Sequence, residues 1–210
     1  LVQFYVEGSD ALGVKSTYPA GGTNSRALFR VNDGNAIADA LHNLRILMTD
    51  ADTTLLHAPT NVMSNDGMGA TIVYNEQQVF YDLSLHLQGS QRGRNDSSRV
   101  GFTISFQPDD LFRGVHGGIS IDRSGGYSGL GGKHDEILLK HMISHAGGLP
   151  QMYDDLVHVI APRPQDSTTG LMMMAKYGDV FLDSQYENGN DGDLFKLELI
   201  YFPTTTTDGN

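Results

Sequence analysis

The fold class follows from residues 79–88, which read Val79-Phe80-Tyr81-Asp82-Leu83-Ser84-Leu85-His86-Leu87-Gln88. The odd-numbered positions are aliphatic or aromatic, and the even-numbered positions are mostly polar. A period of two places alternate side chains on opposite faces of a strand, so the odd-numbered residues are expected on one face and Phe80 with the polar residues on the other. A second alternating run, at 100–106, comes after a loop rich in glycine and serine. Two such runs predict an antiparallel hairpin.

Further extended segments lie on both sides of this hairpin. Strands are expected at residues 44–48, 70–74, 115–122, 156–161, 171–175 and 193–201, and short helices at 51–57 and 179–186. In residues 135–146, apolar side chains recur at helical spacing, and Gly147–Gly148 ends the pattern. The apolar stripe consists of Leu138, Leu139, Met142, Ile143 and Ala146. The predicted fold class is therefore α+β, a mostly antiparallel sheet with one main helix packed against it.

The first 35 residues are set apart from the rest. Two short strands flank a turn-rich loop at 18–25, and residues 32–35 are the best candidate boundary. A two-stranded hairpin is marginal in water, so residues 1–35 are expected either to complete a β-sandwich or to dock on the second unit, residues 42–210. The sequence starts at Leu1 inside a strand-like run, and we interpret it as a piece of a longer polypeptide.

Composition and charge exclude several classes of function. The 210 residues include 14 basic and 25 acidic side chains, and the formal net charge of −11 makes nucleic acid an unfavourable partner. Cysteine is absent, which excludes disulfides, thiolate metal sites and a cysteine nucleophile. No run approaches ~18 consecutive apolar residues, so the sequence predicts no membrane-spanning helix.

The loop at 89–98 is the most distinctive chemical feature of the sequence. It places Arg92 and Arg94, with Arg99 just beyond them, among glycines and hydroxyl side chains. Glycine lets a backbone approach a phosphate closely, and a guanidinium group binds two phosphate oxygens at once. One interpretation is an anion site for nucleotide phosphates. The other is a solvated hairpin tip whose charges serve solubility.

Other motifs lack a residue that their chemistry requires. Residues 126–134 resemble a phosphate-binding loop but lack its first glycine and its magnesium-binding hydroxyl. His141 and His145 have metal-ligand spacing without the glutamate of a zinc protease. The segment Glu187–Asp193 has the composition of a calcium loop but no terminal bidentate glutamate. Asp154–Asp155 are adjacent in an extended segment, so their side chains diverge and are poor candidates for an acid–base pair.

The order of these motifs resembles the spore-coat-protein H (CotH) kinase family. Residues 87–90, the arginine-bearing loop and residues 99–106 are similar to the family stretch R-G-N-S-S … K-K-S-F-R-L-x-F. The helix at 135–146 and the Gly-Gly-Leu-Pro after it are similar to the family helix before G-x-P. Residues 193–196 are similar to the family strand G-N-L-Y-K. As an ordered set, the resemblance covers residues 42–203.

The resemblance implies the amino-terminal lobe of a protein-kinase-like fold. That lobe would bind ATP with magnesium for phosphoryl transfer to a protein hydroxyl. Arg92, Arg94 and Arg99 would contact the phosphates, and Glu136 would pair with a basic phosphate ligand. Val100 stands where the family has its second lysine. The family's catalytic and metal-binding aspartates belong to a carboxy-terminal lobe that these residues do not include, so the resemblance implies weak nucleotide binding without turnover.

The amino-terminal strands carry a second resemblance. Residues 1–31 resemble the last strands of an immunoglobulin-like domain, as in large secreted bacterial proteins that place such domains before a CotH module. This implies an extracellular or cell-surface location. An alternative function of a different class stays open. It is a non-catalytic extracellular binding or adhesion module, with a calcium-stabilised turn at 187–193.

Overall fold

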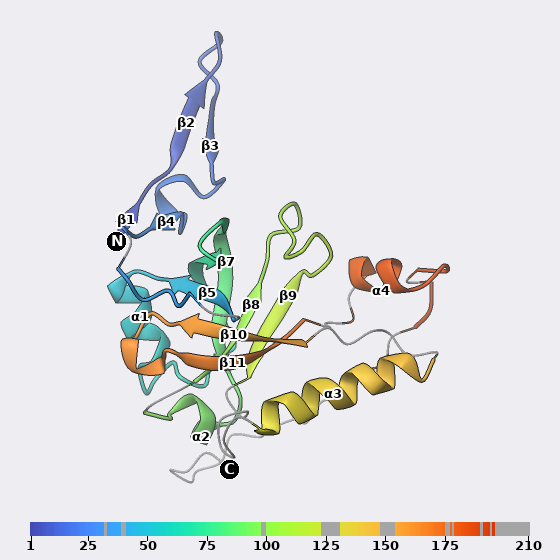
Figure 1. Cartoon of the computed structure of the whole chain (residues 1–210). Coiled ribbons are helices and arrows are strands. Elements are labelled where there is room, and N and C mark those ends of the chain that lie inside the picture. Colours follow the sequence, from blue (N-terminus) through green and yellow to red (C-terminus); the bar gives the residue numbers. More distant parts are fainter. Residues whose placement is uncertain are drawn as a thin grey trace.

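The fold is described from a computed structural model of the whole chain (Figure 1). The residues that the structure describes are 1–31, 33–38, 41–97, 100–122, 131–147, 154–174, 177, 179–189, 191–193 and 195. Within these ranges, no helix is long and apolar enough to cross a membrane. The helices are α1 (Asp50–Leu56), α2 (Gln91–Arg94), α3 (Gly131–His145) and α4 (Asp179–Gln185), with short 3₁₀ helices η1 (Gly22–Asn24) and η3 (Pro164–Asp166).

Seven strands close into a barrel. They are β5 (His42–Leu47), β6 (Met68–Tyr74), β7 (Gln78–Gln88), β8 (Gly101–Ser105), β9 (Gly118–Asp122), β10 (Asp154–Ile160) and β11 (Thr168–Met173). Their order around the barrel is β5-β6-β7-β8-β9-β11-β10. Every neighbouring pair is antiparallel except β10 and β5, which pair in parallel and close the ring. The predicted hairpin is present as β7 and β8, with Leu85 opposite Ile104.

The closed barrel corrects the predicted fold class. An α+β combination fits loosely, but the prediction of a mostly antiparallel sheet with one main helix that resembles the amino-terminal lobe of a protein-kinase-like fold is wrong, because the strands close into a barrel. Strand periodicity locates most of the strands. It carries no information on whether β10 returns to β5, because that pairing joins residues more than a hundred positions apart. Closure removes the two edges that an open sheet would leave exposed.

A β-bulge in β7 changes which side chains reach the interior. Ala70 of β6 lies opposite Leu83, whereas Ile72 lies opposite Phe80, so β7 has an extra residue across from this part of β6. Asp82 at this point has φ +56°, a conformation that non-glycine residues rarely adopt. Phe80 is therefore fully buried together with Leu83, and the predicted strict alternation along residues 79–88 is wrong in its first half.

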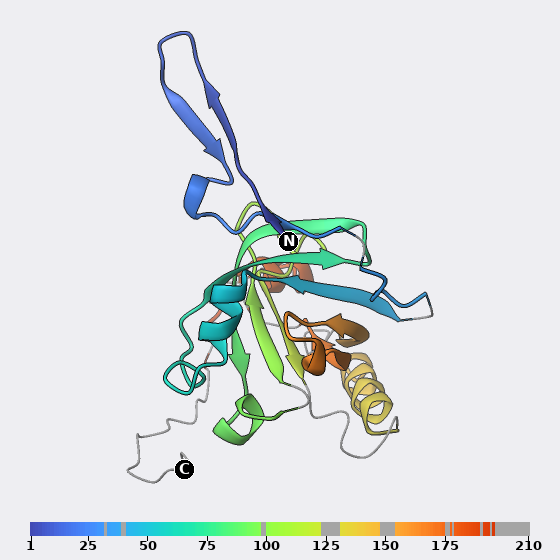
Figure 2. The same ribbon diagram turned by 90° about the vertical axis from the view of Figure 1, so that its left-hand side faces the viewer.

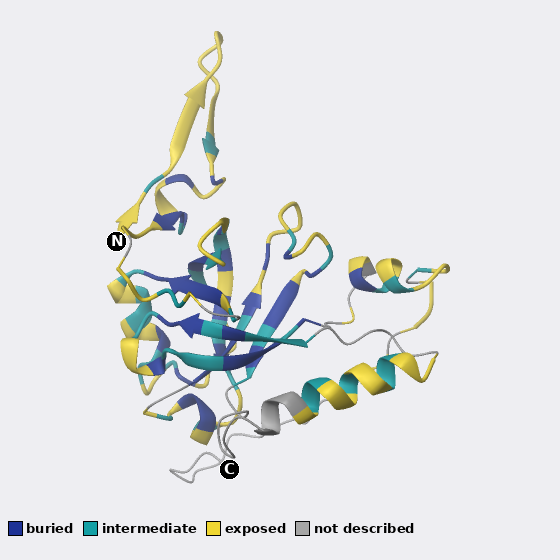
Figure 3. Cartoon of the chain, viewed as in Figure 1, coloured by how far each residue is buried: buried dark blue, intermediate teal, exposed yellow. Residues whose placement is uncertain are grey.

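The main helix does not bury its apolar stripe. Leu138, Leu139 and Met142 of α3 are 57–61% exposed. The helix lies beside β10, where Lys140 Nζ contacts the Asp154 carboxylate, and much of its surface faces solvent (Figure 3). A closed barrel fills its interior with its own side chains, so the core does not need α3 to cover it.

The amino-terminal residues form an arm that rises from the barrel. The strands β2 (Val6–Ser9) and β3 (Lys15–Tyr18) pair as a hairpin that projects away from the other strands (Figures 1 and 2). Between this hairpin and the barrel, β1 (Val2–Gln3) pairs with β4 (Leu28–Phe29). We refer to residues 6–18 as the arm and to residues 1–5 and 19–31 as its base.

The base of the arm is fixed to the barrel by buried contacts. Leu28 is buried, and its backbone N–H donates to Thr71 Oγ1 at 3.0 Å. The Arg26 backbone N–H donates to Asp82 Oδ1 at 2.8 Å, and its guanidinium group pairs with Asp52 of α1. The bulge at Asp82 thus turns a carboxylate of β7 toward this segment. These contacts dock the base of the arm on the barrel, and the completion of an immunoglobulin-like β-sandwich by residues 1–35 stays a prediction.

Candidate anion-binding site

Arg94, one of the predicted phosphate ligands, is used inside the protein. Its side chain is buried, with Nε donating to the Gly89 carbonyl at 2.8 Å. Nη1 donates to the Ser64 carbonyl at 2.9 Å, and Nη2 donates to Asn65 Oδ1 at 2.6 Å. Burial among these neutral acceptors lowers the pKa of Arg94. The guanidinium group therefore fastens residues 62–65 to α2, and each of its three nitrogens already donates.

The other predicted ligands lie in different surroundings. Arg92 is on the exposed side of α2, and Arg99 lies outside the described residues. Glu136 accepts from Lys140 Nζ at 2.8 Å, one turn further along its own helix. Lys140 is therefore held by Glu136 and by Asp154. The structure assigns Arg94 and Glu136 to separate structural contacts, and the nucleotide role of the loop stays a prediction.

A polar cluster that the sequence analysis did not identify lies at one end of the barrel. His42 is the first residue of β5 and Tyr74 is the last residue of β6. Because β5 and β6 are antiparallel, these two residues meet at the same rim. Asp155, near the start of β10, reaches that rim because β10 runs parallel to β5. Arg113 lies in the connection between β8 and β9, within the tight turn that the Phe112–His116 bridge closes.

Arg113 is the centre of this cluster. Its Nη2 donates to the Tyr74 hydroxyl at 2.7 Å and to Asp155 Oδ2 at 3.1 Å. His42 Nδ1 contacts the same hydroxyl and lies 3.6 Å from Asp155 Oδ2. The guanidinium carbon is 5.4 Å from the centre of the Phe112 ring, within cation–π range. Partial burial alone would lower the pKa of Arg113, but its bonds to Tyr74 and Asp155 raise it, so the charge is firmly held.

The backbone at Arg113 is held in an uncommon conformation. Its φ is +52°, and φ of the next residue, Gly114, is +77°. A left-handed conformation costs a non-glycine residue ~1 kcal/mol or more. The turn is closed by Phe112, whose N–H donates to the His116 carbonyl at 3.0 Å. Backbone strain of this kind is over-represented at functional sites, but it also occurs here at Asp82, whose carboxylate has a structural contact.

A hollow of about 320 Å³ adjoins Arg113, a volume within the ~300–1,000 Å³ typical of ligand pockets. It is lined by Arg113, Val115, His116, Ser184 and Gln185. We call it the rim pocket. His116 is buried with its ring 5.7 Å from that of Phe181 on α4. Burial and the nearby Arg113 charge lower the pKa of His116, so its imidazole is neutral at pH 7. The pocket thus presents one cation, a neutral imidazole, a hydroxyl and an amide.

No local motif could have revealed this site. His42 and Asp155 are more than a hundred residues apart, and Tyr74 and Arg113 come from two further segments. Their only sequence signal was the turn composition around Gly114 and the adjacent pair Asp154–Asp155. The divergence predicted for that pair is consistent with the structure: Asp154 contacts Lys140, and Asp155 joins the rim cluster.

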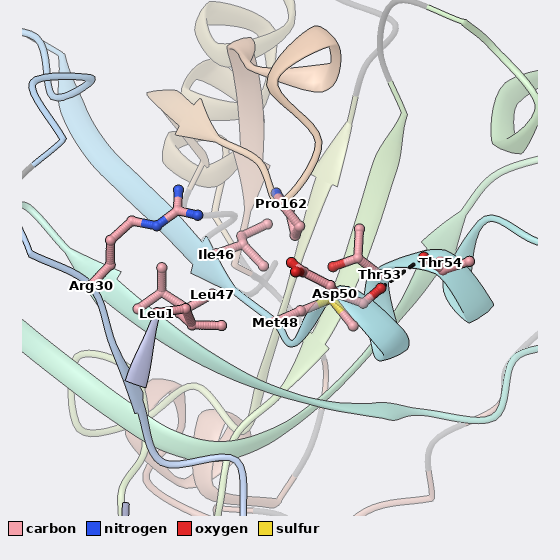
Figure 4. A pocket seen from close by; sticks show the side chains of 9 residues that line it. All are labelled: Leu1, Arg30, Ile46, Leu47, Met48, Asp50, Thr53, Thr54 and Pro162. Atoms are coloured by element: carbon pink, nitrogen blue, oxygen red, sulfur yellow. Dashed lines mark hydrogen bonds between the residues drawn. The ribbon is translucent and has the colours of Figure 1, made fainter. Parts of the chain in front are cut away.

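A second hollow, of about 170 Å³, lies at the base of the arm (Figure 4). Its lining consists of Leu1, Arg30, Ile46, Leu47, Met48, Asp50, Thr53, Thr54 and Pro162. Arg30 and Leu1 lie on one side, Asp50 and Thr53 lie on the other, and Ile46 is between them. Arg30 Nη1 already pairs with Asp33 at 3.3 Å. We call this the base hollow.

A buried polar cluster lies just beyond α1. Asp166 Oδ2 accepts from Arg163 Nε at 2.6 Å and lies 3.9 Å from His57 Nε2. The His57 side chain is only 7% exposed, and among the described residues neither of its ring nitrogens has a hydrogen-bond partner. Burial, reinforced by the Arg163 charge and opposed by Asp166, lowers the pKa of His57 to about 4. A histidine buried in its neutral form makes the stability of the fold sensitive to acid.

Neither comparison with known proteins nor the search for metal ligands assigns a function to the sites described above. No family model and no curated protein matches this chain. Among the described residues, no group of three or more histidine and acidic side chains could hold a metal ion. The calcium interpretation of residues 187–193 and the CotH resemblance therefore stay predictions.

Proposed function

We propose that this chain is a non-catalytic binding module whose rim pocket recognises the phosphoryl group of a small ligand, with a nucleotide as the reference compound. The observation that supports it is the arrangement of Arg113. Tyr74 and Asp155 hold Nη2, and among the described residues no acceptor takes a hydrogen bond from Nε or Nη1. A pre-oriented guanidinium group with two such donors at a pocket is suited to phosphate oxygens.

The other groups in the pocket favour a hydrogen-bond acceptor over a cation. The Gln185 amide can donate to a phosphate oxygen without adding a second charge, whereas the single N–H of neutral His116 already bonds to the Met174 backbone. Asp155 works in the opposite direction because its carboxylate neutralises part of the Arg113 charge. The net charge of −11 also repels anions at long range. We therefore expect modest affinity, with a Kd on the order of 0.1–1 mM.

We propose that the rim pocket binds its ligand without catalysing phosphoryl transfer. Phosphoryl transfer requires metal ligands and a residue that orients the attacking hydroxyl. We assign neither to the rim pocket. The predicted extracellular location is compatible with a binding module and stays a prediction.

Isothermal titration calorimetry tests the proposal with three probes: ATP with magnesium, inorganic pyrophosphate and calcium chloride. We expect both phosphorylated probes to bind the wild-type chain. Arg113→Gln should weaken that binding at least about 10-fold, because one charge-assisted contact contributes about 1.5–3 kcal/mol. The matched control, Arg92→Gln, removes a guanidinium group from α2 and should leave the affinity unchanged.

Two outcomes would redirect the proposal. If Arg92→Gln abolished binding and Arg113→Gln did not, the loop at 89–98 would be the anion site. Heat from calcium alone would favour the turn at 187–193 and an adhesion role. Absence of heat with both phosphorylated probes at millimolar concentration would reject the rim pocket as a phosphoryl site.

A further inference from the structure

The base hollow is a polar site with charges of opposite sign on its two sides. Ile46, Leu47 and Met48 line it, but each of these side chains is only 2–4% exposed, so they offer a ligand little apolar surface. Arg30 and Asp50 extend toward each other from opposite sides of Ile46 (Figure 4). A ligand in this hollow therefore meets a cation and an anion at the same time.

Arg30 keeps hydrogen-bond donors for a ligand. Its Nη1 donates to Asp33 Oδ2 at 3.3 Å, and among the described residues no acceptor takes a hydrogen bond from its Nε or Nη2. Asp33 is held more closely by buried Arg45, whose Nη1 donates to both carboxylate oxygens, at 2.9 and 2.8 Å. A ligand carboxylate can therefore bind Arg30 without breaking the buried pair of Asp33 and Arg45.

The opposite side of the base hollow supplies acceptors. Among the described residues, the Asp50 carboxylate takes part in no hydrogen bond or ion pair, and Thr53 Oγ1 takes part in no hydrogen bond. The Thr54 hydroxyl is already used, since it donates to the Asp50 backbone carbonyl at 2.8 Å. An ammonium group is a donor with no acceptor of its own, so the free carboxylate and hydroxyl suit it.

The volume of the base hollow limits the size of its ligand. An apolar cavity of about 150 Å³ accommodates benzene, so about 170 Å³ accommodates roughly six or seven non-hydrogen atoms. Free alanine and serine fall in this range, whereas free phenylalanine is about twice too large. The low exposure of Ile46, Leu47 and Met48 likewise favours a ligand with a short side chain.

We propose that the base hollow binds a small zwitterion, an α-amino acid with a short side chain, whose carboxylate binds Arg30 and whose ammonium group binds Asp50 and Thr53. A ligand with a single charge would leave one of the two facing charges without a counter-charge. Arg30 belongs to the base of the arm and Asp50 to α1, so the bound ligand bridges the arm and the barrel. The base hollow shares no lining residue with the rim pocket, and this site does not depend on the proposed phosphoryl site.

An NMR titration of the isotope-labelled wild-type chain tests the ligand class with four probes: L-alanine, propionate, ethylammonium and L-phenylalanine, at constant ionic strength. We expect L-alanine to bind with a Kd on the order of 1 mM and to shift the backbone amide signals of residues 50–54. Propionate and ethylammonium should each bind at least about 10-fold more weakly, because each lacks one charge-assisted contact. Phenylalanine should not shift these signals.

Two results of this titration would overturn the proposal. Propionate binding as tightly as L-alanine would make the base hollow a simple anion site. Unchanged signals with L-alanine at about 50 mM, far above the expected Kd, would show that the hollow binds no amino acid.

Charge-removing variants test the assignment of each end of the ligand. Arg30→Gln and Asp50→Asn should each weaken L-alanine binding at least about 10-fold. The matched controls Arg92→Gln and Asp66→Asn remove the same groups at exposed positions outside the hollow and should bind as the wild type does. Arg113→Gln should also leave L-alanine binding unchanged. Wild-type affinity in Arg30→Gln or Asp50→Asn, or loss of L-alanine binding in Arg113→Gln, would overturn the proposal.

Discussion

Arg94 and Arg113 are both tied to other segments of the chain by hydrogen bonds, yet their surroundings give them opposite roles. Arg94 is enclosed by neutral carbonyl and amide oxygens that use all three of its nitrogens, and burial lowers its pKa. Arg113 is held through one nitrogen by Tyr74 and Asp155, which raise its pKa, and it lines a hollow. The contrast shows that an arginine is available to a ligand only where the fold leaves donors unused.

Substitution of Arg94 is expected to cause the largest change in the free energy of unfolding. Arg94→Met should lower the free energy of unfolding by about 3 kcal/mol, because buried acceptors at Gly89, Ser64 and Asn65 lose their donors. Urea unfolding followed by circular dichroism measures the change. Phosphate binding per folded molecule should not change. A fully stable Arg94→Met protein would show that Arg94 is not a structural residue.

The His57 cluster extends the comparison to a third arginine, Arg163, which pairs with buried Asp166. The pKa of His57 is about 4 in the folded chain and near 6.5 when unfolded, so the unfolded chain binds more protons between these values. Stability should be fully present above about pH 6.5 and fall by about 3 kcal/mol as the pH approaches 4. Urea unfolding across this range measures the loss.

His57→Phe provides the control for that titration. The substitution removes the titrating ring and keeps an apolar side chain of similar shape, so the part of the pH dependence due to His57 should disappear. An unchanged slope across the same pH range would assign the acid sensitivity to other groups.

A smaller effect is expected from the group that orients Arg113. Tyr74→Phe removes the hydroxyl that accepts from Nη2 at 2.7 Å but keeps the ring. We expect pyrophosphate binding to weaken about 3- to 5-fold and stability to change by about 1 kcal/mol or less. The affinity of this variant, compared by calorimetry with that of Arg113→Gln, separates the effect of orienting the guanidinium group from the effect of its charge. Equal losses in both variants would mean that the hydroxyl itself contacts the ligand.

Substitution of Arg92 is expected to cause the smallest change in the free energy of unfolding. Its side chain is on the exposed side of α2, and Arg92→Gln should change the free energy of unfolding by less than about 0.5 kcal/mol. Thermal unfolding of this variant beside Arg94→Met tests the comparison within a single helix. A loss as large as that of Arg94→Met would mean that both arginines of α2 are structural.

Sequence patterns predicted the elements that local periodicity specifies. The hairpin of β7 and β8 followed from two alternating runs, and α3 followed from apolar residues at helical spacing. The bulge at Asp82 was missed because the residues around it keep a regular alternation, and only pairing with β6 shows the phase change. The exposure of Leu138 and Met142 was missed for a related reason, since periodicity predicts an apolar stripe but not the surface that covers it.

The candidate site likewise has some features that local sequence predicted and others that depend on the folded structure. Arginines in a glycine-rich loop could be recognised from their neighbours in the chain, but the burial of Arg94 could not. The rim cluster joins four segments through barrel closure, and no spacing along the chain encodes that proximity. Strand and helix positions, net charge and the absence of thiol chemistry could be established from the amino-acid sequence alone, because they depend on composition and on contacts between near neighbours. Which acceptors each described arginine meets was decided by the folded chain, because that depends on long-range strand pairing and on the groups that it brings within reach.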